Sequence, residues 1–169
     1  MASFALISKK TKSISGNVAI PGDKSISHRA IMMGGIAIGQ TQIQDLLEGE
    51  DVLRTADAMR SMGAKIEKRS DGMWICHGVG IGGLREPNNV LDMGNSGTST
   101  RLLMGLVSSQ PIQATFIGDN SLSNRPMNRI TEPLKMMGAQ ITARDTGKLP
   151  VTVKGATNII PIEYQLPVA

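Results

Sequence analysis

The chain has 169 residues, of which 40% are hydrophobic and 19% charged. This composition supplies a core for one domain or two small subdomains and excludes an intrinsically disordered chain. The net charge of +4 suits either a mildly basic surface without function or a site that attracts small anions. The aromatic content of 2% argues against nucleic acid as a partner, because few rings are available to stack on bases.

The N-terminal segment does not follow the pattern of a secretory signal. Its weakly apolar start, residues 1–7, precedes Lys9, Lys10 and Lys12, whereas a signal peptide places its positive charges first. No apolar run reaches the roughly 18 residues that cross a membrane. The single cysteine, Cys76, excludes an internal disulfide and suits a reducing compartment. We therefore expect a cytoplasmic protein without a membrane partner, with residues 1–15 as a lead-in.

The first predicted unit covers residues 16–87. A strand over 17–21 runs into a polar turn, and a helix follows that carries Arg29 and then small and apolar residues. The apolar positions of a second helix recur at i, i+4 and i+7, on one helix face: Val52, Ala56 and Met59. Gly63 follows where a helix end needs a left-handed residue. A strand is predicted over 64–67.

The second predicted unit, residues 88–157, repeats the first. Met62–Ile66 returns as Met137–Ile141, 75 positions later (137 − 62). The helix before it has apolar positions at the same spacing: Ile130, Leu134 and Met137. The turns also correspond, since Gly22–Arg29 matches Gly94–Arg101 at an offset of 72 (101 − 29). A chance similarity of two α/β units is the alternative.

Each unit therefore predicts a strand, a turn, a helix, a strand, a helix and two strands. The fold class is α/β (α+β), with two βαβαββ-type repeat units. In the second unit a strand is predicted over 139–143, and Pro133 interrupts the helical pattern before it. Either that helix starts after Pro126 or it is kinked. Residues 158–169 resemble the strand-to-turn entry at 17–21, so we expect the start of a truncated third unit.

The turn Pro21–Arg29 is a candidate anion site. Lys24 places a compact charge at a helix start, Ser25 offers a hydroxyl, and Arg29 offers a planar fork one turn into the helix. Gly22 permits an unusual backbone angle and the close approach of a ligand. A nucleotide P-loop is excluded, because it needs a glycine directly before the lysine, where this chain has an aspartate. A capped helix with solvated charges is the alternative.

Two further segments are candidates for anion binding. In Asn95–Arg101, Gly97 and Thr98 put backbone and hydroxyl donors at a helix start, in the position that the first turn occupies in its own unit. Gly118–Met127 is a polar loop that leads into a helix, and its Arg125 is placed to reach an anion. An ordinary helix cap and a solvated loop arginine are the alternatives.

The remaining polar residues indicate structural roles. His28 and His77 have no partner at metal-ligand spacing, so we predict no metal site, and we expect His28 to serve packing or helix-start polarity. Cys76 lies in an apolar run and predicts a buried, inert thiol. Three carboxylates precede or open the second helix, where the helix dipole favours them as caps: Glu48, Glu50 and Asp51.

Three ordered motifs resemble the signatures of the EPSP synthases: Pro21–Arg29, Gly94–Thr98 and Gly118–Met127. The resemblance runs from about Ser15 to the last residue. It implies the enolpyruvyl transferase inverse α/β barrel, with two lobes of three βαβαββ-type units, of which this chain would supply two units of one lobe. It also implies transfer of enolpyruvate from phosphoenolpyruvate to the 5-hydroxyl of shikimate 3-phosphate in aromatic amino-acid biosynthesis. Phosphate is released, and no metal or organic cofactor is implied.

The resemblance assigns roles to particular residues. Lys24 would contact both substrates and act in catalysis, while Ser25 and Arg29 would hold shikimate 3-phosphate. Four residues would contact phosphoenolpyruvate or line its pocket, where the analogue glyphosate would also bind: Asn95, Gly97, Thr98 and Arg125.

The resemblance also places an acid–base Asp and Glu, and further Lys and Arg, in sequence that would follow Ala169. We therefore expect the isolated chain to be inactive or nearly so, and to act with a complementary C-terminal portion. One alternative is the related UDP-N-acetylglucosamine enolpyruvyl transferase, which typically carries a reactive Cys five positions before the arginine that matches Arg125; here that position is Asn120. Another is a non-catalytic anion-binding or assembly fragment.

Overall fold

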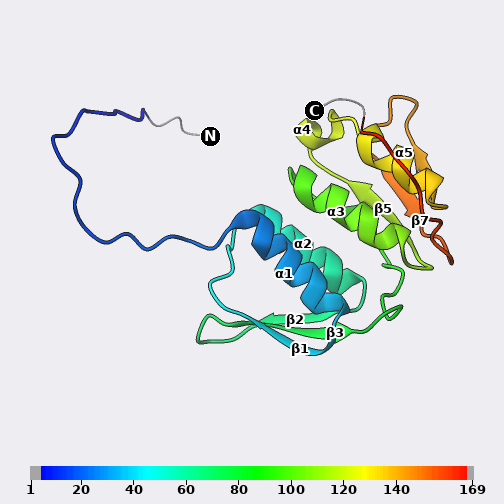
Figure 1. Cartoon of the computed structure of the whole chain (residues 1–169), viewed down its shortest axis with the longest axis horizontal. Coiled ribbons are helices and arrows are strands. Elements are labelled where there is room, and N and C mark those ends of the chain that lie inside the picture. Colours follow the sequence, from blue (N-terminus) through cyan, green and yellow to red (C-terminus); the bar gives the residue numbers. More distant parts are fainter. Residues whose placement is uncertain (1–4, 167–169) are drawn as a thin grey trace.

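The computed structural model describes residues 5–166, which form two α/β halves that share one hydrophobic core (Figure 1). The helices are α1 (Lys24–Ile36), α2 (Glu50–Ser61), α3 (Gly97–Ser108), α4 (Asn120–Ser123) and α5 (Asn128–Met136). The strands are β1 (Ile38–Ile43), β2 (Lys65–Lys68), β3 (Trp74–Val79), β4 (Leu91–Asp92), β5 (Gln113–Ile117), β6 (Gln140–Ala143) and β7 (Val151–Lys154).

The first half is a three-stranded sheet with two helices on one face (Figure 1). Its strands lie in the order β1-β3-β2, and both neighbouring pairs are antiparallel. Ile38 lies opposite Val79, and Ile43 lies opposite Trp74. Along β2 only Ile66 is buried, because one face of the strand packs on the core and the other meets solvent.

The second half repeats this arrangement and adds an edge strand. Its order is β4-β5-β7-β6, with β4 parallel to β5 and the other pairs antiparallel. The antiparallel part β5-β7-β6 corresponds to β1-β3-β2, and β5 and β6 begin 75 positions after β1 and β2 (113 − 38 and 140 − 65). The predicted repeat is therefore confirmed as a structural one. The exact unit boundaries, 16–87 and 88–157, stay predictions.

The two halves also end their second helix in the same way. Gly63 and Gly138 have φ angles of 100° and 106°, and each follows the last residues of a helix. The amide of Ala64 donates to the carbonyl of Met59 at 3.0 Å, and that of Ala139 donates to Leu134 at 3.1 Å. This is the Schellman geometry, in which glycine takes the left-handed conformation without a steric cost. The predicted helix stops are confirmed.

The core lies between the helices and sheets of both halves, and α2 packs against α3 at the seam (Figure 1). Its largest fully buried side chains are mostly methionine and aliphatic, as the low aromatic content requires: Ile31, Met59, Met62, Met93, Leu103, Met104, Phe116, Leu122 and Met127. Each such side chain contributes roughly 1.5–3 kcal/mol relative to an exposed one. The shared core therefore holds the helix starts of the two halves in a fixed relation.

The predicted first strand is wrong. Residues 17–21 lie in the extended segment before α1, and Val18 and Ile20 are 79% and 81% exposed. Its counterpart β4 pairs with β5, but the corresponding edge of β1 carries no strand among residues 5–166. β-branched residues such as Val18 and Ile20 form a strand only where a partner edge is in reach.

The C-terminal part of the described chain also differs from the prediction, which was a new strand. Residues 158–166 form no strand, and the amide of Ile160 donates to the carbonyl of Met137 at 3.0 Å. Residues 167–169, the end of the predicted entry into a third unit, lie outside the described residues. Of the two alternatives for the proline-containing helix, the later start holds: α5 begins at Asn128 and contains Pro133.

None of the helices within residues 5–166 combines the length and apolar character needed to cross a bilayer. The longest of them, α1, has 13 residues.

Candidate functional site

The start of α1 carries the first group of predicted residues. The Asp23 side chain caps the helix by accepting from the amide of Ile26 at 2.8 Å. Lys24, Ser25 and Arg29 are all exposed, and the guanidinium of Arg29 donates to the carbonyl of Ser25 at 3.1 Å. These three residues, called the first cradle below, present two cations and a hydroxyl to solvent at a helix N-terminus, where the helix dipole favours an anion.

Gly22 has a different role from the one predicted. A Cβ at this position would lie 2.1 Å from the main-chain oxygen of Asp45. The close approach that Gly22 permits in this structure is between two parts of the chain. Gly22 lets the turn before α1 pack against the segment that leads to α2.

Asp51 was missed as a site residue. It lies in the first turn of α2, as predicted for a carboxylate favoured by the helix dipole, but its carboxylate forms an ion pair with the ammonium of Lys24. Glu48 instead accepts from Lys68 at 2.6 Å and from the indole of Trp74 at 3.1 Å, and the Lys68 hydrogen bond lowers the pKa of Glu48. The sequence offered one signal for Asp51. It lies at the start of α2, in the same unit as the start of α1 that carries Lys24.

The start of α3 brings together three of the residues predicted for the second site. Asn95 accepts from the guanidinium of Arg125 at 2.8 Å and donates to Asp119 at 2.8 Å. A Cβ on Gly97 would lie 3.2 Å from a guanidinium nitrogen of Arg125. Thr98 is exposed beside them. Asn95, Gly97, Thr98 and Arg125 are called the second cradle below.

Asp119 is the second residue that sequence reasoning did not assign. It caps α4 by accepting from the amide of Leu122 at 2.7 Å, and it holds the amide group of Asn95. The Leu122 hydrogen bond, followed by that of Asn95, lowers the pKa of the Asp119 carboxyl. Asp119 therefore stays ionised and orients Asn95, which in turn orients Arg125.

Like charges gather beside the second cradle. A pocket there is lined by Arg101, Arg125, Pro126, Asn128, Arg129 and Glu132. Burial, and after it the charges of Arg125 and Arg129, lower the pKa of Arg101. The guanidinium of Arg101 donates to the carbonyl of Gly97 at 3.1 Å. Cations that repel one another across an open pocket are stabilised by an anion between them.

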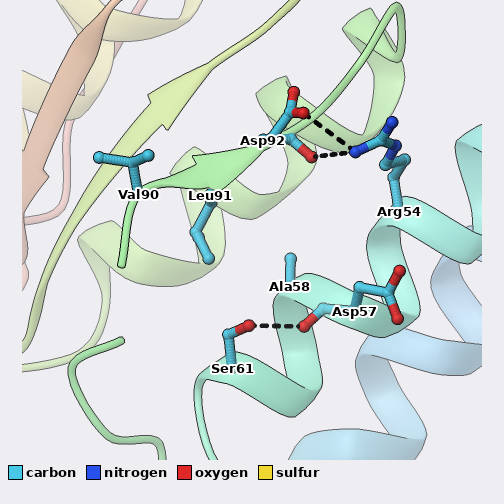
Figure 2. Close-up of a pocket in the computed structure, with 7 residues that line it drawn as sticks. All are labelled: Arg54, Asp57, Ala58, Ser61, Val90, Leu91 and Asp92. Atoms are coloured by element: carbon cyan, nitrogen blue, oxygen red, sulfur yellow. Dashed lines mark hydrogen bonds and ion pairs between the residues drawn. The ribbon is translucent and has the colours of Figure 1, made fainter. Parts of the chain in front are cut away.

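A second pocket lies at the seam of the two halves and has a different character (Figure 2). Arg54 of α2 reaches across to Asp92 at the end of β4, with 3.1 Å between nitrogen and carboxylate oxygen, and it also pairs with Glu50 at 3.5 Å. The other carboxylate oxygen of Asp92 accepts from the amide of Gly94 at 2.9 Å. The positive charge of Arg54 is thus balanced by two carboxylates of the same chain. The pair with Asp92 ties α2 to the loop before the second cradle.

The two cradles share no direct hydrogen bond within residues 5–166. They are joined through buried side chains of α1, α2 and α3, which include His28, a residue predicted to serve packing and found fully buried. Cys76 is also fully buried, and burial raises the pKa of its thiol, which confirms the predicted inert cysteine. No group of three metal-ligating side chains occurs in the described part of the chain.

Comparison with known proteins adds the family. The protein-family model for EPSP synthase (3-phosphoshikimate 1-carboxyvinyltransferase) matches residues 8–169. A 3-phosphoshikimate 1-carboxyvinyltransferase of Novosphingobium aromaticivorans is 62% identical over 156 residues, which are 92% of this chain and 35% of that protein. The Zymomonas mobilis protein of the same name is 62% identical over 164 residues, 97% of this chain and 36% of its own length.

A solved structure agrees with these sequence relatives. EPSP synthase from Acinetobacter baumannii superposes with a TM-score of 0.86 at 50% identity, covering 91% of this chain and 35% of its own. The predicted enolpyruvyl transferase fold is thereby confirmed for the part that the chain covers. The chain spans about a third of the length of the curated relatives it matches.

Proposed function

This chain belongs to the EPSP synthase family, and we propose that it forms the N-terminal part of an enzyme that transfers enolpyruvate from phosphoenolpyruvate to shikimate 3-phosphate. The observation that carries the proposal is the pair of cationic cradles at the starts of α1 and α3, held by one shared core. Both proposed substrates carry a carboxylate and a phosphate, which helix N-termini and arginine forks bind well. Phosphate leaves as an anion during the transfer, and the cations of such a site stabilise the negative charge that develops on it.

The first cradle would hold shikimate 3-phosphate. Ser25 is exposed on the opening turn of α1 and Arg29 one turn further on, so a phosphate there meets both the helix dipole and the guanidinium fork. Lys24 would contact both substrates. Its ion pair with Asp51 fixes the ammonium near the start of α2, where an incoming anion would meet it.

The second cradle would hold phosphoenolpyruvate. Arg125 is oriented by Asn95, and the absence of a side chain on the buried Gly97 lets the guanidinium groups of Arg101 and Arg125 approach the start of α3. Thr98 adds an exposed hydroxyl. A small ligand with two anionic groups fits this arrangement better than a nucleotide sugar does, and Asn120 stands where the related enzyme for that substrate carries its cysteine.

We propose further that turnover needs the C-terminal two thirds of the family's length. The two cradles supply cations and backbone donors, but an acid and a base must also move protons during the transfer. The chain spans 35–36% of the Novosphingobium and Zymomonas relatives, and the remaining carboxylates and cations would come from the rest of that length. We propose a cytoplasmic location, in keeping with the single buried thiol.

The test uses residues 1–169 followed by the remaining sequence of the Novosphingobium relative, called the completed protein below. It should release phosphate only when shikimate 3-phosphate and phosphoenolpyruvate are both present. Arg29→Lys and Arg125→Lys keep the charge but lose the planar fork. We expect Arg29→Lys to raise KM for shikimate 3-phosphate about tenfold, and Arg125→Lys to raise KM for phosphoenolpyruvate about tenfold, which is about 1.4 kcal/mol each.

The matched control is Arg69→Lys, because Arg69 is an exposed arginine that pairs with Asp71 at 2.8 Å in the loop between β2 and β3. It should leave both KM values within about twofold. A completed protein without turnover of these two substrates would contradict the function. Turnover with the KM effects exchanged between Arg29 and Arg125 would contradict the assignment of the cradles.

A further inference from the structure

A chain of buried polar side chains links α1, α2 and α3. His28 lies on α1, Thr55 on α2 and Ser99 on α3, and all three are 0% exposed. The Nδ1 atom of His28 lies 2.8 Å from the hydroxyl of Thr55, which lies 2.7 Å from the hydroxyl of Ser99. Ser96, the cap of α3, lies 2.5 Å from Ser99. Polar groups this deep are costly unless they satisfy one another, so the arrangement is specific.

The direction of the hydrogen bonds follows from one proton on each hydroxyl. Ser99 donates to the main-chain oxygen of Asp51 at 3.0 Å and can therefore only accept in its contacts with Thr55 and Ser96. The single hydroxyl proton of Thr55 goes to Ser99 at 2.7 Å or to the main-chain oxygen of Asp51 at 3.3 Å, so Thr55 accepts from His28 in either case. His28 then carries a proton on Nδ1, and burial lowers its pKa, which favours the neutral imidazole. Its Nε2 is a bare acceptor, and it has no hydrogen-bond partner among the described residues.

His28 and Ser96 end this chain, and Asp51 joins it to the first cradle, because the main-chain oxygen of Asp51 lies 3.3 Å from the hydroxyl of Thr55 as well as 3.0 Å from that of Ser99. Asp51, which accepts from Ser99 through its main-chain oxygen, pairs through its carboxylate with Lys24 of the first cradle. Ser96 and Ser99 lie on either side of Gly97 and Thr98, in the opening turn of α3. One continuous set of hydrogen bonds thus runs from the partner of Lys24 to the helix start that carries the second cradle.

We propose that His28, Thr55 and Ser99 are positioning residues that fix the first cradle against the second, so that binding of an anion at one strengthens binding at the other. This inference rests on the proposed function for the identity of the two anions. None of the three side chains is exposed, so none touches a substrate. They act through the ordered Lys24–Asp51 pair and the start of α3. When the first anion orders both cradles through these side chains, the second anion loses less conformational entropy on binding.

A measurement of how strongly binding at one cradle affects binding at the other distinguishes this role from a merely structural one. In the completed protein, the Kd of shikimate 3-phosphate is measured alone and again with saturating inorganic phosphate as the second anion. The ratio of the two Kd values is the coupling factor, and reciprocity requires the same factor in the opposite titration. A hydroxyl that served stability alone would lower the unfolding midpoint and leave this ratio unchanged.

Thr55→Val keeps the shape of the side chain and removes the hydroxyl, and Thr55→Ser restores the hydroxyl. We expect Thr55→Val to reduce the coupling factor at least threefold, with the Kd of shikimate 3-phosphate alone within twofold, and Thr55→Ser to recover most of the coupling. The matched control is Ser108→Ala. Ser108 is a buried hydroxyl at the far end of α3 that donates to the carbonyl of Met104 at 2.7 Å.

Ser99→Ala, a smaller change, gives the same comparison if Thr55→Val does not fold. An unchanged coupling factor in a folded variant would overturn the proposal, as would an equal loss in Ser108→Ala. Failure of the proposed function would be seen separately, as absence of turnover in the unmodified completed protein.

The tautomer of the His28 imidazole can be measured without any substrate. The chain has two histidines, so ¹⁵N-labelled imidazoles give two sets of resonances. We expect one histidine to be held as the Nδ1–H tautomer at neutral pH, and Thr55→Val to release it to a mixture. An Nε2–H tautomer for His28 in the unmodified chain would reverse the hydrogen bonds and overturn the proposal.

Discussion

At the scale of single residues, a methyl group added at Gly97 should weaken binding at the second cradle and not at the first. The added Cβ would lie 2.8 Å from a guanidinium nitrogen of Arg101 and 3.2 Å from one of Arg125. Both atoms end flexible side chains, so the fold should tolerate alanine while the arginines move. We expect Gly97→Ala in the completed protein to raise KM for phosphoenolpyruvate, and the inhibition constant of glyphosate, by about tenfold or about 1.4 kcal/mol.

Gly105 provides the control on the same helix. A Cβ there would meet no atom within 4 Å, so Gly105→Ala should leave KM unchanged and stabilise the protein by roughly 0.5–1 kcal/mol. Steady-state kinetics and denaturant unfolding measure the two effects. If Gly97→Ala binds phosphoenolpyruvate and glyphosate as the parent does, the second cradle is misplaced.

His28 should make stability depend on pH. Burial, and after it the charges of Lys24 and Arg29, lower its pKa below the ordinary 6.5, against the opposing effect of Asp51. The unfolded chain therefore binds the proton more readily than the folded one. Stability is complete above pH 6.5 and falls as the pH drops through that value.

The measurement is urea unfolding of the completed protein between pH 7.5 and 5, compared with His28→Gln. We expect the parent to lose stability relative to the variant over this interval, because glutamine takes no charge. A parallel pH dependence of the two proteins would show that His28 is not buried as the neutral form.

At the scale of elements, the helix ends were predictable and the polar connections were not. Met62-Gly63 and Met137-Gly138 occur in sequence as local patterns, and a Schellman cap depends only on residues within one turn. The contact of His28 with Ser99 joins residues 71 positions apart and needs the packing of three helices. The ion pair of Lys24 with Asp51 likewise depends on how α1 and α2 pack.

The repeated cap gives a paired prediction. Gly63→Ala and Gly138→Ala each force a side chain into the left-handed region, and we expect each to cost roughly 1 kcal/mol of unfolding free energy. Gly63 has only the stem of Arg85 near its Cβ position, so strain rather than a clash should dominate there. Denaturant unfolding of the completed protein gives both values. A stabilising effect of either alanine would contradict the assigned cap.

The strand predicted over 17–21 failed for a reason that belongs to this scale. The β-branched residues Val18 and Ile20 favour a strand, but pairing needs a neighbouring edge, and the chain leads these residues away from β1 (Figure 1). The positions of Lys24 and Arg29 near the start of α1 were predictable, because a cation at a helix start is a local feature, while their roles in binding stay predictions. Asp51 and Asp119 were missed because a carboxylate there also serves as an ordinary cap.

At the scale of the whole molecule, we propose that one site is divided between this chain and the rest of the family's length. The chain supplies two cationic cradles on one core, and it spans 35–36% of the Novosphingobium and Zymomonas relatives. Sites of this kind work by excluding water and by moving protons between fixed groups. One lobe that binds anions on an open surface should do neither at a useful rate.

The most direct test is phosphate release from shikimate 3-phosphate and phosphoenolpyruvate by residues 1–169 alone, compared with the completed protein at equal concentration. We expect no release above background from the chain alone and sustained release from the completed protein. Release by the chain alone at a comparable rate would show that the acid and base lie within these residues, and it would contradict the division of the site.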